Sequence, residues 1–335
     1  MTAAGLAAET PNKHKSPQKS KPDVIGFLEK GICFDRTMQN TAFLEGIPLQ
    51  AIFDQRRRVL QQSHDRKTEH PIPKISHHIW VTDPAHPREV SDKNLGYMKA
   101  TLSLLPTSKG WRHILWTNAP DLIPKTIRSL RPYGLQVKVI NRHNLKALQT
   151  HYAIYLKAYR FNLAAVSDVV RAMSVHQYGG FYFDVDHQLL QPIDALTTKY
   201  SFIIAEEGSG NRLDNCAFGA APRHPILTEA LRMLTKHFSS HPPGYVLAVQ
   251  HDHAFTIAAT GPLLFSLAFF RKANAAPGLN DTLVIKKTGH YPGIPVLEPK
   301  AFGAQHYSAS WVTAEGQRQY PHCRRIVTNA WDEQF

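Results

Sequence analysis

Two aspartates at the end of an aromatic run are the residues of this 335-residue chain best placed to do chemistry. The stretch Tyr178–Asp186 reads Tyr-Gly-Gly-Phe-Tyr-Phe-Asp-Val-Asp, a glycine turn followed by a β-prone run and two carboxylates. In an extended strand residues i and i+2 point the same way, so we expect Asp184 and Asp186 to face one site. Converging carboxylates suit Mg²⁺ or Mn²⁺, whose open positions substrate phosphates fill. The pattern indicates handling of a nucleotide diphosphate.

A second polar pair precedes this run on a predicted helix. Asp168 and Arg171 are spaced i, i+3 within Ser-Asp-Val-Val-Arg, and an ordinary ion pair on a helix face would explain them. The helix is otherwise apolar, however, so the pair should be partly buried and should need satisfying partners. Sugar hydroxyls would serve as such partners.

The elements that position these residues alternate between strand and helix. Such alternation predicts an α/β fold with a mostly parallel sheet covered on both faces, and ligands of such sheets bind at the carboxyl ends of the strands. Trp80 and the Asp-Val-Asp pair both fall at such ends. We expect strands at 74–80, 111–117 and 135–140, and helices at 93–105, 121–132 and 155–177.

Composition and missing motifs narrow the function classes. Lys and Arg number 39 against 26 Asp and Glu, a formal charge of +13, which favours a phosphate-bearing donor, nucleic acid or an acidic membrane surface. Neither G-x-G-x-x-G nor G-x-x-x-x-G-K-[ST] occurs, so dinucleotide and P-loop interpretations lose their main support. The basic residues are scattered and no RNA motif appears, so no nucleic-acid partner is expected. A basic nucleic-acid-binding protein and a metal-dependent phosphoester hydrolase stay open as alternatives to the main interpretation.

Three segments are expected along the chain. Residues 1–22 read as a disordered basic leader, 23–70 as a helical segment, and 71–335 as the catalytic domain with a C-terminal lid. No apolar run reaches the roughly 18 residues of a transmembrane helix, so we expect a soluble protein, with peripheral membrane contact left open. The 3 cysteines are far apart and form no C-x-x-C, which argues against structural zinc or a disulfide framework and favours a reducing compartment.

An ordered set of motifs runs along the chain. The motifs are Pro73–Trp80, Trp111–Trp116, Ser167–Arg171, Tyr178–Asp186, Asn215, Arg223–Pro225, Ala259–Pro262 and Gln305–Trp311. Across about residues 71–312 this set resembles the DXD sugar-binding region of glycosyltransferase family 32, typified by initiation-specific alpha-1,6-mannosyltransferases, and the related core of the large clostridial glucosylating toxins. The resemblance implies a GT-A fold, a UDP- or GDP-sugar donor, Mn²⁺ or Mg²⁺, and retention at the anomeric carbon.

The resemblance also implies roles for residues of the first half of the chain. Trp80, with Ile79 beside it, would stack on the nucleobase, and a Trp before a polar loop suits a half-open platform. Asp168 and Arg171 would hold the donor sugar. We expect Tyr182 to point away from the carboxylate pair.

Metal binding would then fall to the aspartates and to the late chain. By the same resemblance Asp186 would bind the metal directly and Asp184 would bind ribose or the metal through water. His306 would complete the metal shell, with a serine oxygen of the same segment as the alternative ligand. Ser310 and Trp311 would touch the phosphates when a lid over 303–312 closes.

The histidine pair His77–His78 would need further ligands for zinc, so we expect it to pack in a strand.

The biological setting follows from composition and resemblance. A cysteine-poor enzyme without the membrane anchor of the family's Golgi members suits a bacterial protein. It would modify a protein or glycan acceptor, either in the cytoplasm or as an effector secreted into a host cell. The sequence does not fix the donor base, the sugar or the acceptor.

Overall fold

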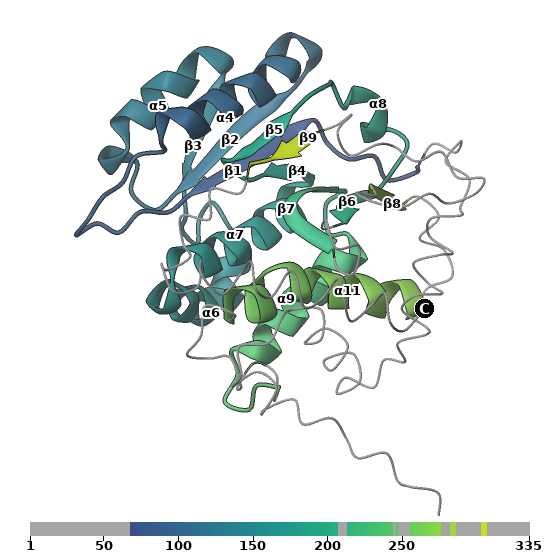
Figure 1. The fold of residues 1–335 in the computed structure, drawn as a ribbon. Coiled ribbons are helices and arrows are strands. Elements are labelled where there is room, and N and C mark those ends of the chain that lie inside the picture. The colour runs from purple at the N-terminus through teal and green to yellow at the C-terminus, as the bar shows by residue number, and fades with distance from the viewer. Residues whose placement is uncertain are drawn as a thin grey trace, which may run out of the picture.

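A seven-stranded sheet with the order β3-β2-β1-β4-β7-β6-β8 is the frame of the protein (Figure 1). The structure is a computed structural model that describes residues 68–206, 213–243, 246, 255–275, 282–285 and 303–306. Within the sheet β7 pairs antiparallel with β4 and β6, and the other pairings are parallel. The strands are β1 Ile75–Trp80, β2 Arg112–Thr117, β3 Leu135–Val139, β4 Gly180–Phe183, β6 Phe202–Glu206, β7 Leu213–Ala220 and β8 Thr282–Ile285.

Helices cover both faces of this sheet. Figure 1 shows α4 and α5 on one face and α6, α7, α9 and α11 on the other. This is the mostly parallel, helix-covered α/β sheet expected of a GT-A fold, and that fold class is confirmed. The helices are α4 Asp92–Leu104, α5 Pro124–Leu130, α6 Ala147–Phe161, α7 Leu163–Tyr178, α8 Asp194–Thr197, α9 Pro225–His237 and α11 Pro262–Ala275.

The long helix expected over 155–177 is two helices, α6 and α7, separated at Asn162. Asn162 has the extended backbone φ −166° and ψ 163°, and its side chain accepts a hydrogen bond from Ala165 N at 2.7 Å. Asparagine competes with the helix through such a bond and therefore favours the cap position. Its Nδ2 also donates to Thr256 Oγ1 at 2.7 Å, which ties the start of α7 to a short π-helix, Thr256–Thr260.

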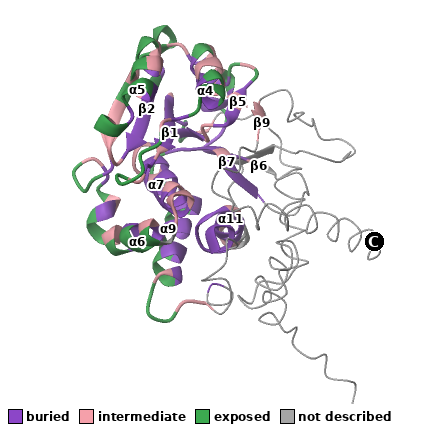
Figure 2. Cartoon of the chain, turned by 60° about the vertical axis from the view of Figure 1, so that its left-hand side comes forward, coloured by how far each residue is buried: buried purple, intermediate pink, exposed green. Residues whose placement is uncertain are grey.

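Strand β4 separates two hydrophobic cores by simple alternation. Phe181 and Phe183 join the core beneath α8, whereas Tyr182 joins the larger core that includes α7, α9 and α11. The purple ribbon of Figure 2 shows β1, β7, α7 and α11 almost wholly buried. Successive side chains of a strand point to opposite faces. Residues that follow β4 on the same side as Tyr182 therefore lie close to α7.

A second, two-stranded sheet carries the late chain to the end of β4. Strand β5, His187–Leu189, pairs antiparallel with β9, Gly303–Gln305. A side chain at position 303 would collide with the imidazole of His187, so glycine is required for this close approach. The leader expected at 1–22, residues 23–67 and the remainder of the lid after 306 lie outside the described residues.

None of the helices that the structure describes is long and apolar enough to span a bilayer.

Candidate functional site

The two aspartates sit in a tight turn rather than along a strand. Strand β4 ends at Phe183, and His187 N donates to Asp184 O at 3.0 Å, which closes a turn over residues 184–187. The expectation that strand alternation aligns Asp184 with Asp186 is therefore wrong, because the chain has already left the sheet. The turn nevertheless keeps them close, since the Asp186 charge raises the pKa of Asp184.

Arg171 of α7 links the helix to this turn. Its Nη2 lies 3.2 Å from Asp168 Oδ1 and 3.2 Å from Asp184 Oδ1, and its Nη1 donates to Asn215 O at 2.9 Å. The guanidinium carbon lies 4.3 Å from the centre of the Tyr182 ring. Burial alone would lower the pKa of Arg171, but Asp184 and its other neighbours raise it above its ordinary value. The side chain is thus a permanent cation that is only 7% exposed.

Asp168 is satisfied on both carboxylate oxygens by protein groups. Its Oδ1 accepts from Asn215 Nδ2 at 2.9 Å and its Oδ2 accepts from Thr260 Oγ1 at 2.9 Å. Burial raises the pKa of Asp168, while Arg171 and these two bonds act in the opposite direction. The partners that we expected from sugar hydroxyls are therefore supplied by β7 and the π-helix. Direct contact of Asp168 and Arg171 with a donor stays a prediction.

Tyr182 points toward Asp184, and the expectation that it points away from the carboxylates is wrong. Asp184 directly follows the last residue of β4, and its carboxylate stays on the side of the sheet where Tyr182 lies. The phenol donates a hydrogen bond to Asp184 Oδ1. Burial raises the pKa of Tyr182 well above its ordinary value, so it stays a neutral donor at physiological pH.

Asp184 and Asp186 form a pair of carboxylates that suits a hard cation. Burial, with a smaller contribution from the Asp186 charge, raises the pKa of Asp184 to about 7 against the opposing pull of Arg171. Two neighbouring carboxylates are hard oxygen donors whose mutual repulsion a divalent ion relieves. The described residues contain no group of three or more His, Cys, Asp or Glu side chains that could hold a metal. Further ligands would therefore come from substrate phosphates and water.

His306 lies beside the turn, but its imidazole is turned to other partners. Its backbone N donates to Asp186 O at 3.0 Å. Its Nε2 lies 3.1 Å from Gln188 Oε1, and its ring stacks on Tyr97 with centroids 3.7 Å apart. The imidazole of His306 therefore does not join Asp184 and Asp186 in a metal site in this structure. Its contacts with Tyr97 and Gln188 connect the end of β9 to α4 and β5. Ser310 and Trp311 lie outside the described residues.

Trp80 is the last residue of β1, the strand that pairs in parallel with β4. The carboxyl ends of β1 and β4 therefore lie at the same edge of the sheet, as expected. Trp80 is half-buried, and its indole N–H donates to Arg88 O at 2.7 Å. The side chain of Ile79 is only 3% exposed and belongs to the large core. Ile79 can therefore meet a nucleotide through its backbone but not through its side chain.

Sequence reasoning missed two residues of the site. Asp214 of β7 raises the pKa of Asp184 and of Asp168, and its Oδ1 accepts from Cys216 N at 2.9 Å. Gln305 donates from Nε2 to Asp186 Oδ1 at 2.8 Å. Asp214 lies directly before Asn215, and Gln305 is the first residue of the motif Gln305–Trp311, to which no role was given. A closer look at the motif residues and their flanks would have found both.

Comparisons with known proteins place this site in a family. Residues 95–203 match the model of the glycosyltransferase sugar-binding region containing a DXD motif. Inositol phosphoceramide mannosyltransferase 3 of Schizosaccharomyces pombe is 26% identical over 199 residues, which cover 58% of this chain and 44% of that protein. A mannosyl phosphorylinositol ceramide synthase of Saccharomyces cerevisiae is 24% identical over 222 residues, covering 66% and 47%.

The chain spans about half the length of the curated relatives it matches. Among solved structures, the PaToxG glycosyltransferase aligns with a TM-score of 0.49 and 17% identity over 67% of this chain and 77% of its own. The resemblance expected from the sequence is confirmed by the family match, which includes Asp168, Arg171 and both aspartates of the turn. Residues 95–203 therefore match the glycosyltransferase sugar-binding region that contains the DXD motif.

Proposed function

We propose that this protein is a metal-dependent, retaining glycosyltransferase that moves a hexose from a nucleotide-diphosphate sugar to a hydroxyl group of a glycan or lipid acceptor. The observation that carries the proposal is the buried Arg171, which joins Asp168 to Asp184 at the carboxyl end of β4 within the matched DXD region. The names of the relatives, which transfer mannose to inositol phosphoceramide, favour mannose as the sugar and a lipid-linked acceptor.

The residues of α7 and β4 fix the turn before any substrate arrives. Arg171 and Tyr182 both hold Asp184 Oδ1, so the carboxylate is preorganised and needs little rearrangement during reaction. Asp184 and Asp186 would hold the divalent ion, which when bound would neutralise charge on the leaving diphosphate. Trp80, half-buried at the end of the neighbouring strand, would stack on the nucleobase.

Retention is proposed through attack on the same face from which the diphosphate leaves. In this step the bond from the anomeric carbon to phosphate breaks, and a bond from the anomeric carbon to the acceptor oxygen forms. The acceptor proton moves to the leaving phosphate oxygen. Asp168 supports this route, because its carboxylate is engaged by Asn215 and Thr260 and is therefore poorly placed as a nucleophile. The segment after β9 would exclude water that otherwise hydrolyses the donor.

A nucleotide-sugar panel tests the proposal directly. The protein is incubated with GDP-mannose, UDP-glucose or UDP-N-acetylglucosamine, with Mn²⁺, with Mg²⁺ or with a chelator, and donor cleavage is followed by mass spectrometry. We expect one donor to be cleaved in the presence of metal and none with the chelator. Release of phosphate from simple phosphoesters without cleavage of any nucleotide sugar would instead support the hydrolase alternative.

A matched pair of variants ties the activity to the turn. Asp186→Ala should lower turnover at least about a hundredfold, because it removes a carboxylate that would hold the divalent ion needed to neutralise the leaving diphosphate. Asp121→Ala removes an exposed carboxylate of the same matched region and should leave turnover unchanged. Full activity in Asp186→Ala would overturn the proposal.

The bacterial setting expected from composition is not part of the proposed function, since the relatives come from two yeasts.

A further inference from the structure

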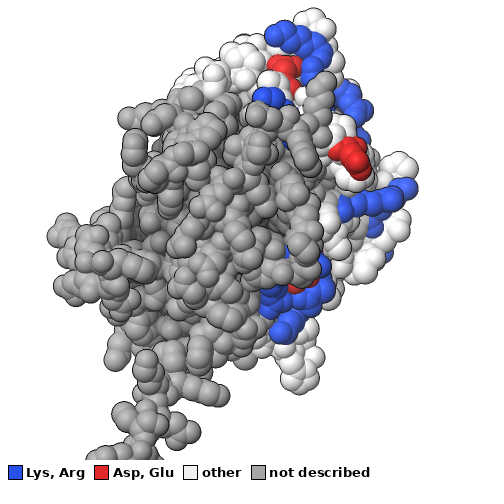
Figure 3. All heavy atoms as spheres, turned by 90° about the vertical axis from the view of Figure 1, so that its right-hand side faces the viewer, with Lys and Arg blue, Asp and Glu red and all other residues white. Residues whose placement is uncertain are grey.

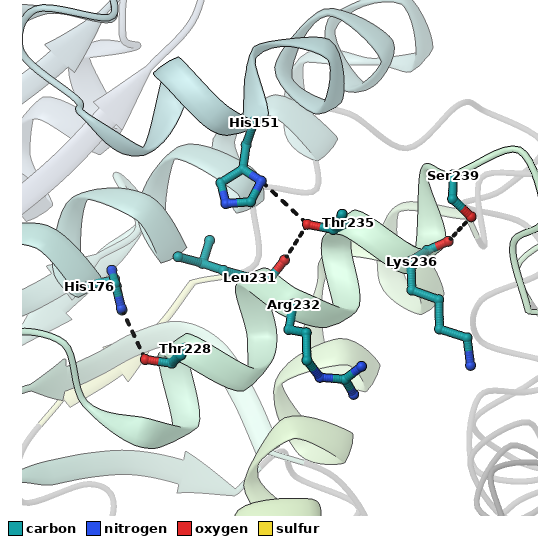
Figure 4. Close-up of a pocket in the computed structure, with 8 residues that line it drawn as sticks. All are labelled: His151, His176, Thr228, Leu231, Arg232, Thr235, Lys236 and Ser239. Carbon is teal, nitrogen blue, oxygen red and sulfur yellow. Dashed lines mark hydrogen bonds between the residues drawn. The ribbon is translucent and has the colours of Figure 1, made fainter.

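An open groove of about 630 Å³ lies between α6, α7 and α9, on elements that do not carry the DXD turn. Figure 4 shows the imidazoles of His151 and His176 reaching the hydroxyls of Thr235 and Thr228, at 3.3 Å and 3.1 Å. Arg232 and Lys236 of α9 also line the groove, and Figure 4 shows their side chains pointing away from the two imidazoles. None of these groups takes part in the proposed transfer reaction.

In the part of the chain that the structure describes, the helices around this groove expose positive but no negative side chains. Over residues 141–178 and 221–243, all of which the structure describes, the acidic residues are Asp168 and Glu229, and both are buried. We call the exposed sides of α6 and α9, together with the turn before α9, the basic surface. Its exposed cations include Lys157, Arg160, Arg223, Arg232 and Lys236.

The buried Glu229 does not cancel this charge. Its carboxylate lies 2.6 Å from Arg232, 3.3 Å from Arg271 and 3.9 Å from Lys272. One negative charge therefore faces three positive ones, and the cluster keeps a net positive charge. In the described part of the face drawn in Figure 3, Lys and Arg side chains likewise cover more of the surface than Asp and Glu.

The layout of these groups suits an extended anionic layer better than one small anion. The hydroxyls of Thr228 and Thr235 are already hydrogen-bonded, so they do not form a preorganised cradle for a single phosphate. The cations are carried on long side chains and are spread over two helices. Lys157 Nζ reaches Phe238 O beyond the end of α9 at 2.6 Å, so Lys157 of α6 lies beside the carboxyl end of α9.

Two further features distinguish a lipid surface from nucleic acid. Leu156, next to Lys157 on α6, is 38% exposed, and an apolar side chain among cations is typical of surfaces that enter the headgroup region of a bilayer. Nucleic-acid surfaces instead offer open aromatic rings for base stacking. Tyr152 on the same helix is covered by Arg142, whose guanidinium carbon lies 4.2 Å from the ring centre.

We propose that the basic surface of α6 and α9 docks this protein on anionic lipid membranes through the phosphate-bearing headgroups. Docking is independent of the DXD turn and does not require that the proposed transferase activity be correct. Each Lys or Arg near such a surface strengthens binding about fivefold, and the attraction falls off within a Debye length.

Co-sedimentation of the full chain with lipid vesicles tests the proposal. Vesicles of phosphatidylcholine alone are compared with vesicles that contain about 30% phosphatidylserine, at about 0.1 M and about 0.5 M salt. We expect binding to the anionic vesicles at low salt, little binding at high salt and none to phosphatidylcholine alone. Equal binding to both vesicle types, or no binding to either, would overturn the proposal.

Charge-reversal variants locate the surface. Lys157→Glu with Lys236→Glu should weaken vesicle binding roughly twentyfold or more, since two attractive charges are lost and two repulsive ones are added. Lys157→Gln with Lys236→Gln should give a smaller loss and keeps side chains that can still donate a hydrogen bond. The matched control, Arg128→Glu with Arg131→Glu, changes the charge equally on the exposed side of α5 and the turn after it. An equal loss in this control would show that only net charge matters, and the proposal would fail.

Two further measurements separate other ligands from the lipid surface. Thermal unfolding of each variant shows whether it is folded, and the Gln pair carries the test if the Glu pair is not. A duplex DNA gel shift that depends on Lys157 and Lys236, without vesicle binding, would assign the surface to nucleic acid and contradict the proposal. Loss of vesicle binding in inorganic phosphate at constant ionic strength would indicate a site for one phosphate, which also contradicts it.

Discussion

Two helices of this protein carry an acidic residue and an arginine three positions later, and the consequences differ. On α7 the pair is Asp168 and Arg171, whose side chains are 6% and 7% exposed. On α9 the pair is Glu229 and Arg232, and the arginine side chain is 55% exposed. The same spacing therefore gives a buried, fixed ion pair on α7 and a pair with a solvent-exposed arginine on α9. The difference comes from burial and not from spacing.

Removal of Arg171 should give the largest effect. Arg171→Ala leaves Asp168 and Asp184 buried beside each other without their cation, and breaking a buried pair in this way costs about 3–5 kcal/mol of the free energy of unfolding. Urea unfolding measures this cost. Arg232→Ala should cost less than about 1 kcal/mol, because Arg232 is exposed and Arg271 and Lys272 still face the buried Glu229. Equal costs would remove the distinction between the two pairs.

The hydroxyl of Tyr182 allows the buried site around Arg171 to be tested through a single hydrogen bond. Tyr182→Phe removes a donor to a carboxylate and should lower the free energy of unfolding by about 1.5–3 kcal/mol. It should also reduce kcat, because Asp184 is no longer held in place. Tyr178→Phe removes a hydroxyl that donates to Asn144 O at 2.6 Å, away from the turn. That variant should leave kcat unchanged, and a similar fall in kcat would contradict a positioning role for Tyr182.

Buried histidines predict how stability depends on pH. Burial lowers the pKa of His78 to about 3, and its ring nitrogens have no hydrogen-bond partner among the described residues. The unfolded chain therefore binds the proton more tightly, so stability is full above about pH 6.5 and is lost as the pH falls from there toward about 3.

His78→Leu isolates this contribution. Within that pH range the free energy of unfolding of the unmodified chain should fall by about 1.4 kcal/mol per pH unit more than that of the variant. Asp184, whose pKa is raised, acts in the opposite direction in both proteins, so its contribution cancels in the difference. Parallel pH profiles in urea unfolding would refute this role for His78.

The stack of Tyr97 on His306 should give the smallest effect. Aromatic pairs contribute about 0.5–1.5 kcal/mol beyond their buried area, so Tyr97→Leu should only loosen β9 from the turn. We expect a several-fold rise in donor hydrolysis relative to transfer, measured as the ratio of free sugar to glycosylated acceptor. An unchanged ratio would show that the stack does not help to exclude water.

Four strands could be predicted from the sequence, because local patterns mark 74–80, 111–117, 135–140 and the run before Asp184. Strands β6, β7 and β8 and the order of the strands were not predicted, since pairing joins segments far apart in the chain. The turn at the two aspartates could not be predicted. The strand-like pattern of residues 178–186 extends beyond Phe183, whereas in the structure the hydrogen bond from His187 N to Asp184 O ends the extended conformation. The break at Asn162 was missed for a related reason, because a cap bond to Ala165 N competes with an otherwise helical pattern.

The candidate site was predicted best where apolar neighbours indicated burial, as around Asp168 and Arg171. The partners of these residues could not be predicted, because Asn215 and Thr260 come from distant elements. The zinc interpretation of His77–His78 was rightly set aside in favour of a packed strand, as His77 accepts from Trp116 Nε1 at 3.1 Å in the core.

The pairing of β5 with β9 has a consequence for biosynthesis. Gln305 and Asp186 bond across 119 positions, and contacts of such long range form late because the intervening loop must first be closed. A growing chain can therefore assemble the central strands well before its carboxylate turn is covered. The bond from Gln305 to Asp186 can therefore form only after residue 305 has left the ribosome.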